Sequence, residues 1–324
     1  MKPLVFLLVA MLSIGTAHAQ PSSWQSEFPL TDWQTRSVAF DEIMSGGPPR
    51  DGIPSIDAPS FRPVAEIDDL GADEPVLSVA INGDARAYPL RIMTWHEIVN
   101  DTVGGMPVAV TYCPLCNSGI VFDRTVDGTV LDFGTTGRLR NSDLVMYDRQ
   151  TETWWQQFLG EGIIGAQTGV RLDMVPARLE SWRLFAERHP DGQVLVPNQA
   201  SGRAYGRNPY VAYDSSARPF LYRGDYDGPG GPLSRVVAVG DQAWLLSTLR
   251  DAGTIEAGDL ILTWTPGQNS ALDTSRIDQG RDVGNVVVQR RLANGGLEDV
   301  AYDVPFAFAF AAFHPEATIR DSVD

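Results

Sequence analysis

From Pro75 onward the chain alternates short apolar runs with turn residues, a pattern typical of β-strands. Residues 76–81 and 84–88 flank Asn82-Gly83, and Asn-Gly supplies the positive φ angles of a type I′ turn. This segment is therefore predicted to be a β-hairpin. Beyond a turn at residues 126–128, further strands are predicted at residues 130–133 and 144–147.

Two segments have the spacing of short amphipathic helices. Thr94-Trp-His-Glu97 is a capping-box pattern, which predicts that a helix opens there with its neighbouring apolar residues on one face. A second helix is predicted over residues 179–189, where Pro190 stops it. The run from Phe306 to Phe313 is so apolar that it is expected in the core.

The second half of the chain resembles the first. Residues 263–272, TWTPGQNSAL, lie over residues 111–120, TYCPLCNSGI, with Thr, Pro, Asn and Ser in register. Two further matches stand in the same order and pair residues 236–246 with 79–90 and residues 284–287 with 128–131. Three matches in order predict an internal duplication, with Pro229-Gly-Gly-Pro232 as the linker.

These patterns predict a β-rich α+β fold in which two pseudo-repeated strand-turn-strand halves pack around a shared core. The predicted divisions are a signal peptide at residues 1–19, an extended leader at 20–63, a first half at 64–227 and a second, degenerate half at 228–324. The leader is rich in Pro, Gly, Ser and Asp, which predicts an extended segment that wraps the core.

The first 19 residues have the features of an export signal. Lys2 supplies the positive end, residues 4–14 are apolar, and Ala17-His-Ala19 is a small-residue cleavage site. The apolar stretch is too short to span a bilayer, and no integral membrane segment is expected after cleavage. The protein is therefore expected to be periplasmic or secreted, where disulfides can persist.

Charge narrows the set of partners. Lys+Arg 25 against Asp+Glu 41 gives a formal net charge of -16, which disfavours nucleic acid and anionic membranes. Lys2 is the sole lysine and lies in the signal, so Schiff-base and phosphate-loop chemistry are excluded. A small molecule or a metal ion is the expected partner.

Both cysteines of the chain, Cys113 and Cys116, stand in one turn between apolar runs. At the matching positions of the second half the chain has Thr265 and Gln268, so the two sulfurs are the functional addition to a shared turn. Thioredoxin-type enzymes need a helix after the pair, whereas Asn117 and the residues after it read as a strand.

A Cys-Pro-x-Cys turn between strands indicates a metal knuckle that supplies two thiolates. The remaining ligands must be histidine or carboxylate, and His96 is the best candidate because it precedes the strand that leads to Cys113. Thiolates favour zinc or copper(I) over calcium or magnesium. The sequence thus predicts a soft-metal site of Cys113, Cys116 and His96.

Two alternatives stay open at this point. The cysteines could form a thiol-disulfide redox pair, or an inert disulfide in a ligand-binding or structural module, although so short a loop adds little stability. No residue identifies a substrate or a reaction. Asp143 and Asp148 bracket a strand and are expected at turns facing solvent, with a paired acid/base role as the alternative. His189 is expected as a helix cap, and His314 at the core edge, with a role as a third metal ligand as the alternative. One ring of Trp154-Trp155 is expected inward and the other outward, with packing preferred for both.

Several long motifs resemble an exported bacterial family catalogued as domain of unknown function 3179. They are Ile81-Asn-Gly-Asp-Ala-Arg-Ala-Tyr-Pro-Leu90, Trp95-His-Glu-Ile-Val-Asn-Asp101, Val110-Thr-Tyr-Cys-Pro-Leu-Cys116, Asn141-Ser-Asp143, Met146-Tyr-Asp-Arg149 and Ala312-Phe-His-Pro315. The likeness runs from about Ile53 to Thr318. It implies no particular reaction, and it marks His96, Cys113, Cys116 and Asp143 as positions that match the family's motifs.

Overall fold

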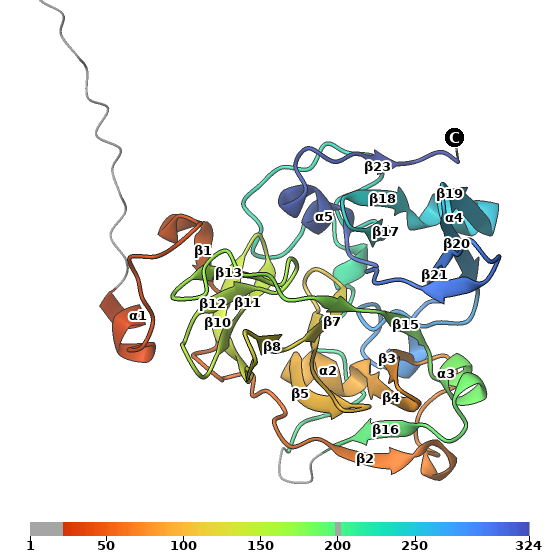
Figure 1. The fold of residues 1–324 in the computed structure, drawn as a ribbon. Coiled ribbons are helices and arrows are strands. Elements are labelled where there is room, and N and C mark those ends of the chain that lie inside the picture. Colours follow the sequence, from red (N-terminus) through yellow and green to blue (C-terminus); the bar gives the residue numbers. More distant parts are fainter. Residues whose placement is uncertain (1–21, 198–201, 324) are drawn as a thin grey trace, which may run out of the picture.

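A computed structural model describes residues 22–197 and 202–323 (Figure 1). The predicted signal peptide at residues 1–19 lies outside the described residues. The described part of the chain is mostly β, with 39% strand and 15% helix. The five α-helices have six or seven residues each: α1 (Ser22–Glu27), α2 (Leu90–His96), α3 (Trp182–Arg188), α4 (Leu246–Ala252) and α5 (Ala307–Phe313).

The strands form five larger sheets and one two-stranded ribbon. The first sheet has the strand order β1 (Ile43–Ser45), β10 (Phe133–Arg140), β11 (Asp143–Asp148), β12 (Trp154–Gln156), β13 (Glu161–Ile164). The second has the order β14 (Met174–Val175), β7 (Ser118–Asp123), β6 (Met106–Cys113), β5 (Ile98–Val103). The third is β15 (Ala177–Ser181), β3 (Pro75–Ile81), β4 (Asp84–Pro89), β16 (Gln193–Val196), β2 (Ser60–Pro63). The fourth has the order β17 (Val236–Val239), β18 (Gln242–Leu245), β23 (Ile319–Arg320). The fifth has the order β19 (Thr254–Ala257), β20 (Leu260–Thr265), β21 (Asn285–Arg291), β22 (Leu297–Asp299). The ribbon consists of β8 (Thr125–Val126) and β9 (Thr129–Val130).

The predicted α+β class with two pseudo-repeated halves is wrong. The five larger sheets are arranged as the blades of a five-bladed β-propeller. Helices of one or two turns are too short to form a layer of their own, so the sheets supply the packing surfaces. The match between residues 284–287 and 128–131 also fails. Asn285 pairs with Thr265 at the end of β20, just as Ser118 pairs with Cys113 at the end of β6. Asn285 therefore occupies the place of Ser118 in the hairpin, and not the place of residue 129 that the sequence match gave it.

One order of elements does recur along the chain. The hairpin β3–β4, helix α2 and hairpin β5–β6 are followed later by the hairpin β17–β18, helix α4 and hairpin β19–β20. The predicted turn of the first hairpin is confirmed, since Asn82 and Gly83 have φ angles of 50° and 84°. This recurrence allows two chemically different regions to be compared at matching positions.

The two predicted helices differ from the structure in their limits. α2 ends at His96 instead of opening at Thr94, because the Thr94 hydroxyl donates to the Leu90 carbonyl within the helix at 2.9 Å. The residues after it, from Ile98, pair with β6 as a strand. α3 begins at Trp182, because the preceding residues pair with β3 as β15.

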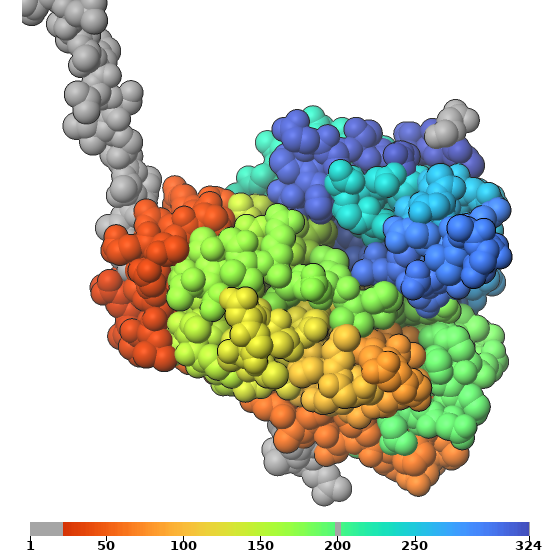
Figure 2. Space-filling view, in the orientation of Figure 1, coloured from red at the N-terminus to blue at the C-terminus, as the bar shows by residue number. Residues whose placement is uncertain are grey.

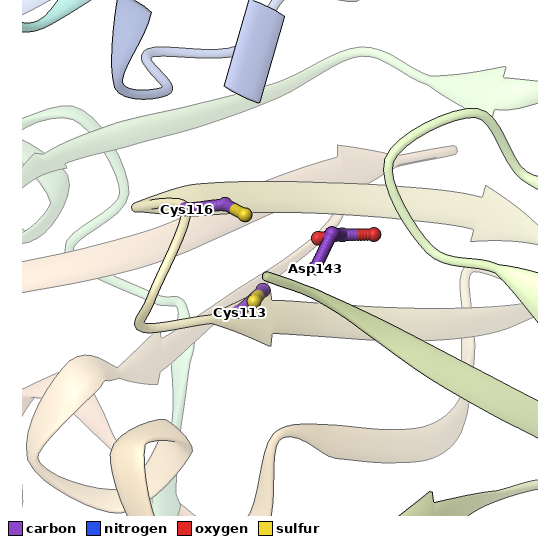
Figure 3. A group of neighbouring side chains, drawn as sticks. All are labelled: Cys113, Cys116 and Asp143. Atoms are coloured by element: carbon purple, nitrogen blue, oxygen red, sulfur yellow. The ribbon is translucent and has the colours of Figure 1, made fainter. Parts of the chain in front are cut away.

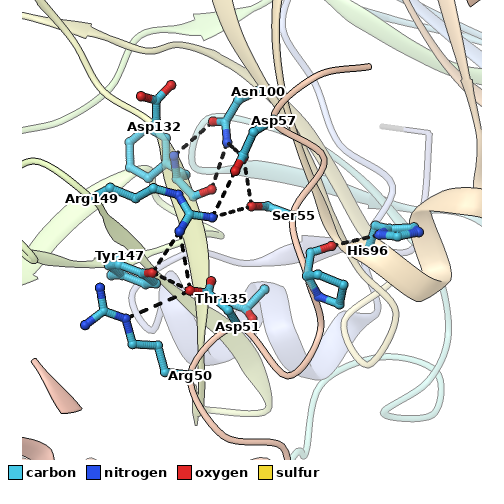
Figure 4. Close-up of polar contacts among 12 residues, drawn as sticks. Arg50, Asp51, Ser55, Asp57, His96, Asn100, Asp132, Thr135, Tyr147 and Arg149 are labelled. Carbon is cyan, nitrogen blue, oxygen red and sulfur yellow. Dashed lines mark hydrogen bonds and ion pairs between the residues drawn. The ribbon is translucent and has the colours of Figure 1, made fainter. Parts of the chain in front are cut away.

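The predicted leader at residues 20–63 adds edge strands to two sheets, through β1 on β10 and β2 on β16. Its described part runs along one side of the body, coloured red in Figure 2, and then along the bottom of the view, where it is orange. Polar contacts hold the loop between these strands (Figure 4). The Tyr147 hydroxyl donates to Asp51 at 2.6 Å, and Arg149 donates to Ser55 at 2.9 Å. Among the described residues, no helix is long and apolar enough to cross a membrane.

Candidate metal centre

The cysteine turn joins two paired strands. Cys113 ends β6 and pairs with Ser118, the first residue of β7, as the sequence predicts. The Cys116 N–H donates to the Cys113 carbonyl at 3.3 Å, and Asn117 has a φ of 51°, which turns the chain into β7. Both sulfurs thereby lie on the same side of the turn, where they face Asp143 (Figure 3).

Asp143, the first residue of β11, completes a group of three. One ligand atom from each of Cys113, Cys116 and Asp143 lies within 4.8 Å of the other two. Asp143 Oδ2 accepts hydrogen bonds from Gln156 Nε2 at 2.6 Å and from the Phe158 N–H at 2.9 Å. Asp143 Oδ1 is buried and accepts no hydrogen bond from a nitrogen or hydroxyl donor among the described residues. The thiols of Cys113 and Cys116 are the donors close enough to act on this carboxyl, and they lower its pKa against the effect of burial. Thiols are weak donors, so this oxygen is available for a cation.

The group is sealed from solvent and lacks a compensating positive charge. Cys116 and Asp143 have exposed fractions of 0%, and Cys113 has 2%. Burial raises the pKa of both thiols, and it raises the pKa of Asp143 to about 7. Burial and the Asp143 charge also raise the pKa of the neighbouring Glu97 to about 8. Among the described residues, no arginine or histidine forms an ion pair with either carboxylate.

Hydrogen bonds with residues much later in the sequence hold the cysteine turn in place. The Phe306 N–H donates to the Cys116 carbonyl at 2.8 Å, and Asn117 Nδ2 donates to the Val304 carbonyl at 2.7 Å. The Tyr213 hydroxyl donates to the Leu115 carbonyl at 2.9 Å. The apolar run that starts at Phe306 is buried as predicted. The turn is therefore held in position by residues far away in the sequence.

The structure does not bring His96 into the group of three. Its Nδ1 lies 2.7 Å from the Pro54 carbonyl (Figure 4), and its Nε2 lies 2.7 Å from the Tyr205 hydroxyl. Both ring nitrogens are thus engaged in hydrogen bonds. His189 is the C-cap of α3 and His314 that of α5. Neither belongs to the group.

Asp143 is the residue that the sequence analysis misjudged. It was expected at a turn facing solvent, and so was Asp148, but both are fully buried. Asp148 accepts hydrogen bonds from Thr151 and from the indole of Trp155, which accounts for its burial. The signal for Asp143 was its place in the Asn141-Ser-Asp143 motif. The two cysteines are not joined by a disulfide in this structure.

Comparison with known proteins shows the family and nothing narrower. A family model described as "Protein of unknown function (DUF3179)" matches residues 50–317, so the chain belongs to this family. No curated protein and no solved structure matches the chain. The family description assigns no reaction, so the function has to be argued from the site itself.

Proposed function

We propose that the protein binds one zinc ion through Cys113, Cys116 and Asp143. The observation that carries this proposal is the convergence of two thiols and an unpartnered carboxylate oxygen in a buried site. Zinc takes sulfur, nitrogen and carboxylate oxygen ligands together, whereas copper(I) favours soft ligands alone. The carboxylate therefore favours zinc among the two metals that the sequence suggests.

The electrostatics support a cation at this place. Ionised thiols and carboxylates repel one another when they are buried together, and burial alone already disfavours their charged forms. A divalent ion reverses both effects, because it binds the deprotonated ligands directly. Zinc binding is therefore expected to release protons and to stabilise the folded chain.

The redox alternative is less well supported. Thiol-disulfide exchange needs an accessible thiolate, and reactive cysteines lie in electropositive, partly exposed surroundings. Here the thiols are buried, and their pKa is raised. Metal binding uses such thiols without requiring access for a partner protein.

His96 is left out of the proposed ligand set because both of its ring nitrogens have partners. Its imidazole connects the leader, through Pro54, to Tyr205. We also propose that the protein works outside the cytoplasm, on the strength of the signal-like residues 1–19.

Elemental analysis of protein reconstituted with zinc under reducing conditions tests the proposal. We expect about one zinc per chain for the wild type and a loss of zinc in Cys113→Ser, Cys116→Ser and Asp143→Ala. Asp148→Asn is the matched control, since Asp148 is a buried carboxylate at the other end of β11. Wild-type protein without zinc, or equal zinc in all variants, would overturn the assignment.

A further inference from the structure

Glu97 adopts a backbone conformation that a glutamate rarely takes. It follows α2 as the C-cap, with φ 60° and ψ −30°. The C-cap of α4, the matching helix in the recurring order of elements, is Gly253, with φ 74° and ψ −42°. Glycine is the usual residue in such a conformation because it has no Cβ to clash. At Glu97 the chain retains a side chain where a glycine would be less strained.

The carboxylate of Glu97 has no partner in the described part of the chain. Glu97 is only 7% exposed, and no hydrogen bond or ion pair of its carboxylate is found there. Several other buried acids pair with arginines, as Glu74 does with Arg91, Glu180 with Arg188 and Asp101 with Arg86. A carboxylate that is largely removed from water and has no donor is costly, so Glu97 is a candidate ligand for a cation.

The backbone places this carboxylate beside the cysteine turn. The Tyr112 N–H, one residue before Cys113, donates to the Glu97 carbonyl at 2.8 Å. The proximity is electrostatic as well, because Asp143 acts on Glu97 and Glu97 acts on Cys113. The backbone of Glu97 therefore lies next to the cysteine turn at the end of α2, while Asp143 approaches the turn from β11.

We propose that Glu97 is the fourth ligand of the metal centre formed by Cys113, Cys116 and Asp143. This inference rests on the proposed zinc site and completes its tetrahedral set. The carboxylate lies outside the 4.8 Å group, so the proposal requires a change of side-chain rotamer, which would break no hydrogen bond of this carboxylate among the described residues. Two thiolates and two carboxylates carry the same charge as the four thiolates of a Cys₄ zinc site.

Zinc affinity and the cobalt(II) spectrum test this assignment. In the cobalt-substituted wild type we expect ligand-field bands of a tetrahedral site that added azide does not change. In Glu97→Gln and Glu97→Gly we expect zinc affinity to fall at least about tenfold, as for the loss of a ligand, and azide to shift the cobalt bands. Glu152→Gln is the control, since Glu152 is a buried glutamate at positive φ that is paired with Arg50.

Failure of the zinc site and failure of the Glu97 assignment give different results in these experiments. If the wild type binds no metal, the zinc site itself is refuted, and the role of Glu97 falls with it. If the wild type binds zinc and both Glu97 variants keep its affinity and its azide-insensitive spectrum, the fourth-ligand assignment alone is refuted. Replacement of a purely structural Glu97 would lower the unfolding midpoint of the metal-free protein and leave the cobalt spectrum unchanged.

Discussion

Two connections between strands differ in how the charge of nearby buried acids is balanced. One joins β6 to β7, and the other joins β20 to β21. The long second connection, residues 266–284, packs against Asp214, which bonds to Ser270 and forms ion pairs with Arg235 and Arg281. Burial opposes the ionisation of Asp214, but these arginines outweigh it and hold the pKa of Asp214 below its ordinary value. This region supplies its own positive charge.

The short first connection holds two thiols beside Asp143 and Glu97, with no arginine paired to them among the described residues. Burial dominates there and raises the pKa of both carboxyls. One region is thus electrostatically complete, and the other lacks a cation. A missing counter-charge at a matching place in the fold therefore indicates a ligand more clearly than the acidic residues alone do.

The largest expected effect separates the two regions directly. Asp214→Asn leaves the buried Arg235 without its counter-ion, which should destabilise the protein by about 3–5 kcal/mol. Asp143→Asn removes a carboxyl that burial already disfavours, so the metal-free protein should keep or gain stability. Urea unfolding of both variants in the presence of a chelator measures the difference. Equal losses would contradict the proposed contrast in charge balance.

The pH dependence of stability sharpens the contrast. The folded-state pKa values of Asp143 and Glu97, about 7 and about 8, lie above their ordinary values, so the folded chain binds more protons than the unfolded chain in this range. The metal-free protein should therefore lose stability from pH 6.5 to 8, by at most about 1.4 kcal/mol per pH unit for each carboxyl. The histidines, whose pKa burial lowers, oppose this trend mainly below pH 6.5.

With zinc bound, the ligands are already deprotonated, so stability should no longer fall between pH 6.5 and 8. Unfolding curves at several pH values, with chelator and with excess zinc, check the sign. Asp143→Asn should make the metal-free curve shallower, with the contribution of Glu97 remaining. A metal-free protein that gains stability across this window would contradict the raised pKa values.

Local patterns of the sequence predicted local structure well. The Asn82-Gly83 hairpin and the Cys113 to Cys116 turn between strands depend on neighbouring residues, and both are present. The capping-box pattern failed because Thr94 and Glu97 have the required spacing but lie at the end of α2, not at its start. Spacing alone does not distinguish the two ends of a helix.

The candidate site depended on contacts that sequence spacing does not encode. Asp143 reaches the cysteines because β11 packs against the cysteine turn from another sheet. Trp154 and Trp155 point to opposite faces of their sheet, as the alternation predicted, and both are buried. Trp155 belongs to the main core, whereas Trp154 is covered by aromatic residues of the leader. The packing of the sheets against one another and against the leader determines where Asp143 and the two tryptophans lie. The hydrophobic period of a single strand carries no information about that packing.

His96 tests how far the site extends beyond its ligands. His96→Ala removes the hydrogen bonds to Pro54 and Tyr205, which should cost about 2 kcal/mol at about 1 kcal/mol each. Zinc content should be unchanged, because the imidazole is not part of the proposed ligand set. Elemental analysis together with urea unfolding distinguishes the two roles. A loss of zinc at full stability would restore His96 as the ligand that the sequence suggested.

The smallest expected effect concerns the C-caps of α2 and α4, which are Glu97 and Gly253. Glu97→Gly should stabilise the metal-free protein by about 1 kcal/mol, because glycine relieves the strain at φ 60° and an unpartnered buried carboxyl is removed. Gly253→Ala should destabilise it by about 1 kcal/mol, because a Cβ is introduced at φ 74° where no metal site compensates. Opposite signs in urea unfolding would mean that Glu97 is retained at a cost in stability. If Glu97→Gly instead destabilised the metal-free protein, the carboxylate would be a structural element of the apo fold, and its burial would need an explanation other than a ligand.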